Sequence, residues 1–353
     1  MANTNLIRFG QNMALAAASQ TPADMWLPVY GGEVLTAFQE YNQFLDKVNY
    51  KTMTSGTTMK FPATWKIGSE YHEAGTELLG LDVETKEYSI SLDDRPLVAH
   101  FEVDDIDTAM THFDVRNELA SETGRELARQ MDRKIAALLI NAARTGADTG
   151  TNSFPVGGNT LLYGGATTGT TEFNHADWST EANAAALVEW IGKICQEMDE
   201  NDVPVNDRCA VVNVPLYYAL RRLGLPYSAS GTATNVTGAA QLWGRPDSGT
   251  AGPRLQDSQG YQLPIDVMGV PVYCSNHIPN SNIATGPSKY RADFTKSGGV
   301  VFQKSAIAVL QLMGIQTEKF RDVRRQSDFM VSKMLMGGGA LRPYCAYEVL
   351  SAN

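Results

Sequence analysis

Residues Asp104–Gly146 read DDIDTAMTHFDVRNELASETGRELARQMDRKIAALLINAARTG, and the rest of the chain is best interpreted around this stretch. Apolar or small residues recur along it at intervals of three and four, with Asn117 filling the one gap, which places them on one face of a single helix. They are Ile106, Met110, Phe113, Ala120, Gly124, Leu127, Met131, Ile135, Leu138 and Ala142. The opposite face carries Glu118, Glu122, Arg125, Glu126, Arg129, Asp132 and Arg133. The uninterrupted part, Asp114 to Thr145, would be roughly 45 Å long, so something equally long must lie against it.

Gly124 interrupts the apolar face of this helix near its centre. A glycine inside a helix costs about 1 kcal/mol relative to alanine, so a structural reason is expected. One interpretation is that another backbone packs closely across it. A second is that Gly124 is a hinge, at which the long helix bends in one state and straightens in another. Both interpretations can hold together.

Composition indicates a globular chain with a substantial core, because 43% of its 353 residues are hydrophobic. The net charge of −10 argues against a surface dedicated to binding duplex nucleic acid. No apolar run reaches membrane-spanning length and no signal-peptide pattern begins the chain, so we expect a soluble cytoplasmic protein without membrane partners. The four cysteines are far apart and predict buried free thiols: Cys195, Cys209, Cys274 and Cys345.

The N-terminal hundred residues predict an arm, a short helix and a hairpin. Residues 1–25 read as a weakly structured arm, and Val34, Leu35, Phe38, Tyr41 and Leu45 fit a helix. Alternation with period two then runs from Thr54 to Asp104, with turn residues near its middle, and predicts a long hairpin with a broad tip. An isolated two-stranded ribbon is marginal in water, so the hairpin needs a surface from elsewhere, and another subunit is one source of it.

The remaining sequence mixes helices and strands without a repeating strand–helix–strand rhythm, which indicates the α+β class. We expect a helix from Thr180 to about Glu200, a buried strand at Cys209–Val214 and a short helix at Pro215–Leu223. The part from Ile265 onward predicts mainly strands.

Motifs for catalysis are missing from the sequence. It contains no GxxxxGK[ST], GxGxxG, HExxH or GxSxG, so we assign no catalytic, cofactor-binding or metal-binding residues and expect no enzyme. One basic cluster stands out, formed by Arg321, Arg324 and Arg325. Because Asp322 and Asp328 share its segment, interface or surface ion pairs are favoured over a phosphate site.

Several stretches together resemble the major capsid proteins of tailed phages with the HK97-like fold, more specifically those of T-seven-like podoviruses. The matching stretches are Gly31–Phe38, Asp104–Ala128, Val203–Arg208, Met268–Pro279 and Ser305–Pro343. The resemblance implies an N-arm at 1–55, an E-loop at 56–103 and a P-domain with its long spine helix at 104–180. It further implies an A-domain at 181–310 and P-domain return strands at 311–353.

The function implied by this resemblance is a coat protein that self-assembles as hexamers and pentamers into an icosahedral shell around the phage genome. Expected partners are other copies of the chain, a scaffolding protein, a portal protein at one vertex, and packaged double-stranded DNA bound without sequence specificity. The expected location is the virion capsid, with assembly in the host cytoplasm. Two alternatives stay open: an encapsulin-like protein compartment and an uncharacterised α+β enzyme.

Under the capsid interpretation the functional residues are those at subunit interfaces. The candidates are Trp65, Tyr71, Leu78, Leu79 and Leu81 in the hairpin, Val34 and Phe38 near the N-terminus, and the three arginines Arg321, Arg324 and Arg325. Gly124 is the hinge candidate.

Overall fold

The computed structural model describes residues 32–39, 41–64, 69, 71–72, 85–104, 115–145, 177–223 and 265–351. The chain divides into two compact units, each built from three separate stretches. The first takes its described residues from Met1–Asn42, Asp93–Met131 and Gln311–Met336, and the second from Gln43–Leu92, Asp132–Leu310 and Gly337–Asn353. Helices and strands are mixed in both, which confirms the predicted α+β class.

The long helix is confirmed as α3 (Val115–Ala143). Its apolar face is buried from Ala120 to Ala142, and the pairs Glu122–Arg125 and Glu126–Arg129 lie on the other side. Two details of the prediction were wrong. Asp104 ends a strand instead of beginning the helix, and Asp132, assigned to the polar face, is completely buried.

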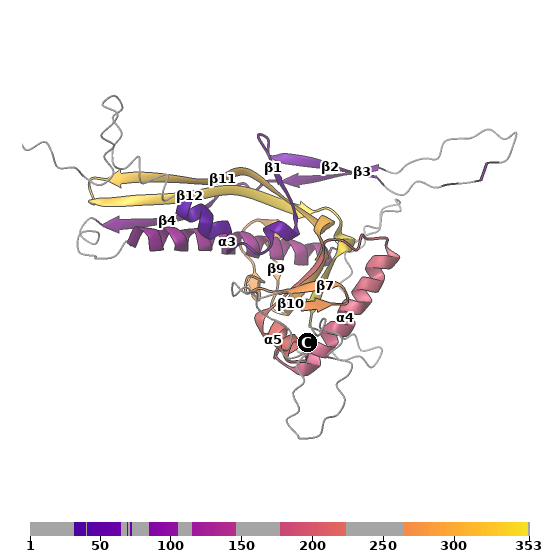
Figure 1. Cartoon of the computed structure of the whole chain (residues 1–353). Coiled ribbons are helices and arrows are strands. Elements are labelled where there is room, and N and C mark those ends of the chain that lie inside the picture. The colour runs from indigo at the N-terminus through magenta and orange to yellow at the C-terminus, as the bar shows by residue number, and fades with distance from the viewer. Residues whose placement is uncertain are drawn as a thin grey trace, which may run out of the picture. The chain divides into compact units, whose positions relative to one another are not determined.

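A sheet with the strand order β1-β11-β12-β4 provides the long surface expected beside α3. Its strands are β1 (Asn49–Thr52), β4 (Leu97–Asp104), β11 (Ile307–Asp322) and β12 (Ser327–Ala340). In the first unit, α3 lies along the face of β4 and β12 (Figure 1). On β12 the alternating residues Met330, Ser332, Met334 and Met336 are buried, which matches a strand with one covered face.

The predicted hairpin is confirmed for β2 (Thr58–Thr64) and β3 (Thr85–Ser91), which pair antiparallel. The apolar alternation at Ala99–Val103 belongs instead to β4, which pairs with β12 of the other sheet. Alternation identifies a half-buried strand but not its partner, because the side-chain period is the same in any sheet.

The second unit contains a sheet of order β13-β10-β5-β7-β6. Its strands are β5 (Arg208–Val212), β6 (Ile265–Val267), β7 (Val270–Cys274), β10 (Ser297–Gln303) and β13 (Ala346–Leu350). Every residue of β5 and β10 is buried, so both faces of these central strands are covered. The short strands β8 (Asn282–Ile283) and β9 (Ala292–Asp293) form a separate pair.

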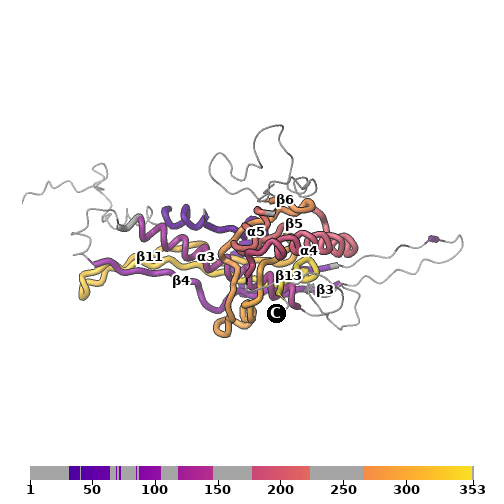
Figure 2. The backbone as a smooth tube through the Cα atoms, turned by 90° about the horizontal axis from the view of Figure 1, so that it is seen from below, coloured from indigo at the N-terminus to yellow at the C-terminus, as the bar shows by residue number. Residues whose placement is uncertain are grey.

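The two shorter helices are α4 (Glu181–Glu200) and α5 (Val214–Leu223), as the sequence predicts. Thr180 caps the start of α4, because its hydroxyl accepts a hydrogen bond from the Asn183 amide. The helices pack against each other and lie beside the second sheet (Figures 1 and 2). Among the described residues, no helix is long and apolar enough to cross a membrane.

Candidate subunit interfaces and their supports

The β2–β3 ribbon has one apolar and one polar face. Met59, Phe61 and Tyr88 are half-buried and Ile90 is buried, whereas Lys60, Pro62, Glu87 and Ser89 are exposed on the other face. Lys60 and Glu87 form an exposed ion pair, with Nζ 3.0 Å from Oε1. An exposed pair of this kind adds little stability, so the ribbon depends on what its apolar face contacts.

Of the candidates near the tip of this ribbon, the structure places only Tyr71, which is fully exposed. Trp65, Leu78, Leu79 and Leu81 lie outside the described residues. Their role at an interface stays a prediction.

Val34 and Phe38 lie on a helix over residues 32–39 and are covered by their own chain, with 0% and 8% exposure. A Cβ at Gly124 would lie 2.5 Å from the Val34 carbonyl oxygen and 2.9 Å from the Ala37 Cβ. Gly124 therefore allows the close approach of another backbone, which is the first of the two interpretations. The hinge stays a prediction. This helix has its partner within the chain, so Val34 and Phe38 have little surface left for a neighbour.

The arginine cluster lies at the turn between β11 and β12. Arg321 contacts Asp328 at 3.2 Å, and Arg325 contacts Glu102 at 3.5 Å. Lys319 is a second cation on Asp328, at 2.8 Å. Arg321 and Arg325 thus each lie beside a carboxylate, which favours ion pairing over a phosphate site.

Two exposed apolar side chains accompany the arginines at this turn, and sequence reasoning missed them. Phe320 is 68% exposed and Val323 is 70% exposed. A large apolar residue inside a charged segment is a signal that could have identified them. Together with Arg324, they give this turn the mixed apolar and basic character that is common at protein interfaces.

Asp132 is a buried anchor for the N-terminal segment, and sequence reasoning missed it as well. Its carboxylate accepts hydrogen bonds from the backbone amides of Gln43 at 2.9 Å and Phe44 at 3.4 Å. His277 Nδ1 lies 2.8 Å from the same carboxylate. Lys47 is close to it, and burial lowers the pKa of that lysine. Three segments distant in sequence thus meet at one carboxylate of α3, which no local pattern could reveal.

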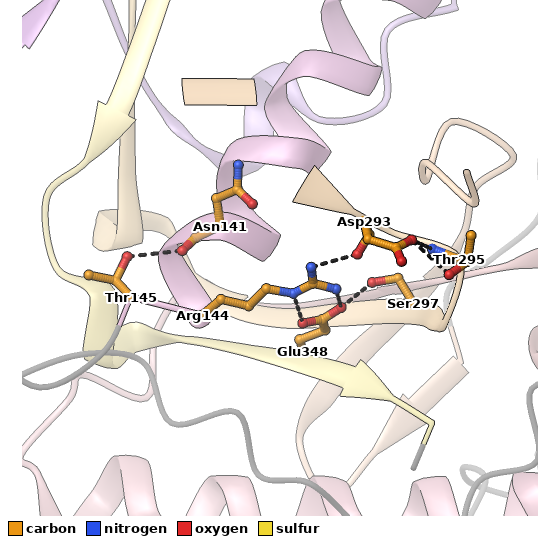
Figure 3. A network of polar contacts seen from close by, with 7 residues as sticks. All are labelled: Asn141, Arg144, Thr145, Asp293, Thr295, Ser297 and Glu348. Carbon is orange, nitrogen blue, oxygen red and sulfur yellow. Dashed lines mark hydrogen bonds and ion pairs between the residues drawn. The ribbon is translucent and has the colours of Figure 1, made fainter. Parts of the chain in front are cut away.

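A partly buried ion pair fastens the C-terminal end of α3 (Figure 3). Arg144 donates two hydrogen bonds of 2.6 Å to the carboxylate of Glu348, which is fully buried in β13. It donates a third to the carbonyl of Asp293, and the Ser297 hydroxyl donates to Glu348. Hydrogen bonds from Thr295, with the nearby Arg144, lower the pKa of Asp293. In Glu348, both oxygens of the buried carboxylate therefore accept hydrogen bonds.

The part of the chain that the structure describes contains neither a candidate metal site nor a disulfide bond. It contains no group of three His, Cys, Asp or Glu residues able to hold a metal ion. All four cysteines are free. Cys209 and Cys345 are buried as predicted, but Cys195 and Cys274 are only partly covered, which corrects the prediction for these two.

Known proteins with similar sequences are phage capsid proteins. The chain is 25% identical to the major capsid protein of Escherichia phage T7, over 96% of this chain and 95% of that protein. It is also 25% identical to the major capsid protein of Enterobacteria phage T3, over 97% of this chain and 96% of that protein.

Solved structures agree with this result. The capsid structure of the cyanophage P-SCSP1u matches over the whole of both chains, with a TM-score of 0.67 and 29% sequence identity. The mature capsid of bacteriophage PhiM1 matches in fold, with a TM-score of 0.64, 16% identity and coverage of 88% of this chain and 87% of that one. The predicted HK97-like fold is confirmed by these neighbours. A family model described as "Gp10A-like: Major capsid protein" matches residues 60–350, and the chain therefore belongs to this family of phage major capsid proteins.

Proposed function

We propose that this chain assembles as hexamers and pentamers into the icosahedral shell of a T-seven-like phage head. In this proposal a scaffolding protein directs assembly in the host cytoplasm, a portal protein occupies one vertex, and double-stranded DNA fills the shell without sequence-specific binding. The ranges expected for the N-arm, E-loop, P-domain and A-domain belong to the same proposal.

Family membership makes the chain a structural component of the virion and a subunit of a multimeric shell. It also confirms the prediction that the chain is not an enzyme and favours the capsid over the encapsulin-like and enzyme alternatives. The finer proposal is supported by the β2–β3 ribbon, which forms a sheet of only two strands in the described part of the chain. Such a ribbon is stabilised when it packs on a further surface, and a neighbouring subunit supplies one.

The net charge of −10 supports the proposal that the shell does not bind its packaged DNA tightly. A strongly basic lining would neutralise phosphates and hold the DNA in place. An acidic chain avoids this, so DNA can be packed and released.

Size-exclusion chromatography with negative-stain microscopy tests the proposal. The purified chain, alone and with the scaffolding protein of its own phage, should give closed shells or rings of five and six subunits. A monodisperse monomer under every condition would contradict it.

A deletion makes the experiment sharper. Removing residues 68–84 leaves residues 65–67 to connect β2 with β3, a length that suits a short hairpin loop. This variant should keep the circular dichroism spectrum and melting temperature of the intact subunit but fail to form shells. Normal shells from it would refute the role of the hairpin in assembly.

A further inference from the structure

The two edges of the β2–β3 ribbon are not equivalent. Within the described residues neither strand pairs with a third strand, so each presents a row of backbone groups away from its partner. Unpaired strand edges are templates for an additional strand, and proteins commonly block the edges that must stay free.

The register of the hairpin determines which backbone groups point outward. Just beyond β2 and β3, the Leu92 amide donates to the Thr57 carbonyl at 2.9 Å. In the register of the ribbon these two residues lie opposite each other, so they form a hydrogen-bonded pair. Hydrogen-bonded and non-hydrogen-bonded pairs alternate in an antiparallel ladder. The non-hydrogen-bonded pairs are therefore Thr58–Ser91, Lys60–Ser89, Pro62–Glu87 and Thr64–Thr85.

Pro62 occupies one of these outward positions on β2. Proline has no N–H, so the ladder to β3 loses nothing, but the open edge of β2 lacks a donor in its middle. On β3 the outward positions are Thr85, Glu87 and Ser89, and each carries both an N–H and a C=O. At the end of this edge the Ser91 carbonyl already accepts a hydrogen bond from Lys289 Nζ, at 2.9 Å.

From this asymmetry we propose that the edge of β3 over Thr85–Ser89 receives an extended segment from a second copy of this chain. The ribbon then becomes part of a sheet that crosses a subunit boundary, while Pro62 keeps the edge of β2 free. The inference rests on the proposed function. A shell places identical subunits at fixed spacing, so the same edge and the same docking segment are available at each contact.

A pair of proline substitutions tests the choice of edge. Ser89 and Lys60 lie opposite each other, both side chains are exposed, and both backbones point outward, on β3 and β2 respectively. Pro62 shows that the ribbon accommodates proline at such a position. Ser89→Pro should raise the subunit concentration needed for assembly at least about tenfold, because a donor is lost and the proline ring obstructs the incoming strand.

Lys60→Pro is the matched control and should assemble like Lys60→Ala, which also lacks the ion pair to Glu87. If Ser89→Pro assembles as well as the control, or if both proline variants fail alike, the choice of the β3 edge is wrong.

Hydrogen exchange on the unaltered chain gives an independent measurement. The amides of Glu87 and Ser89 should gain more protection on assembly than those of Thr58 and Lys60. Equal protection on the two edges in well-formed shells would overturn the inference and leave the proposed function standing. Failure of the unaltered chain to form shells would instead contradict the proposed function.

Discussion

Replacing Gly124 with alanine tests the packing of the N-terminal helix on α3, because this packing decides whether the change raises or lowers the free energy of unfolding. At an open position inside a helix this change stabilises by about 1 kcal/mol. At Gly124 the new Cβ would lie 2.5 Å from the Val34 carbonyl oxygen and 3.2 Å from the Phe38 amide nitrogen. Both are backbone atoms, so a side-chain rotation cannot relieve the overlap.

The expected loss of stability follows from how far the N-terminal helix must move away from α3. The helix over residues 32–39 must retreat until the closest contact lengthens from 2.5 Å to an ordinary 3.4 Å. A gap of that size removes about a quarter to a half of the local dispersion attraction. Val34 and Phe38 each contribute about 1.5–3 kcal/mol when fully buried, so the loss is about 1–3 kcal/mol. After the gain in helix propensity, Gly124→Ala should lower the free energy of unfolding by about 1 kcal/mol, and Gly124→Leu by about 3 kcal/mol.

Urea unfolding of unassembled subunits measures these changes. The difference between Arg133→Ala and Arg133→Gly, at an exposed position of the same helix, supplies the helix-propensity difference alone. Hydrogen exchange over residues 32–39 should also be faster in Gly124→Ala. If that variant is more stable than the unaltered chain by as much as the Arg133 pair differs, the close packing is refuted.

Three further changes have clear expected results. Arg144→Met leaves the carboxylate of Glu348 buried without its cation and should lower the free energy of unfolding by about 3–5 kcal/mol. Changing Glu348 to Met as well should restore much of the lost stability. If the double variant loses as much stability as Arg144→Met alone, the ion pair is not the cause. Asp132→Asn removes the negative charge of the carboxylate that accepts hydrogen bonds from the backbone amides of Gln43 and Phe44. This change should lower the free energy of unfolding by about 2 kcal/mol. Unchanged hydrogen exchange at Gln43 would show that Asp132 does not anchor the segment. Burial raises the pKa of Cys209 to about 12 from an ordinary 9; because the unfolded thiol loses its proton first, stability should fall as pH rises from about 9 to 12. Cys209→Ala should flatten that part of the melting-temperature profile, and an unaltered slope would refute the assignment.

Local patterns predicted the elements whose determinants are close together in the sequence. The apolar face through Leu127, Met131 and Ile135 identifies α3, and the apolar alternation at Met59 and Phe61 identifies β2. The same patterns could not assign β4 to its partner β12, because a strand presents the same alternation to any neighbour.

The sequence by itself determined the class, the helices α3, α4 and α5, most strands, and the resemblance that led to the family. These follow from side-chain periodicity and from residue order, which the chain carries in full. Only the tertiary structure decided that Asp132 is buried, that Gly124 receives the backbone of Val34, and that Pro62 faces the open edge of β2. Each of these facts depends on contacts or register between segments distant along the chain. Such contacts are selected by the packing of the whole core, and no local window of residues contains them.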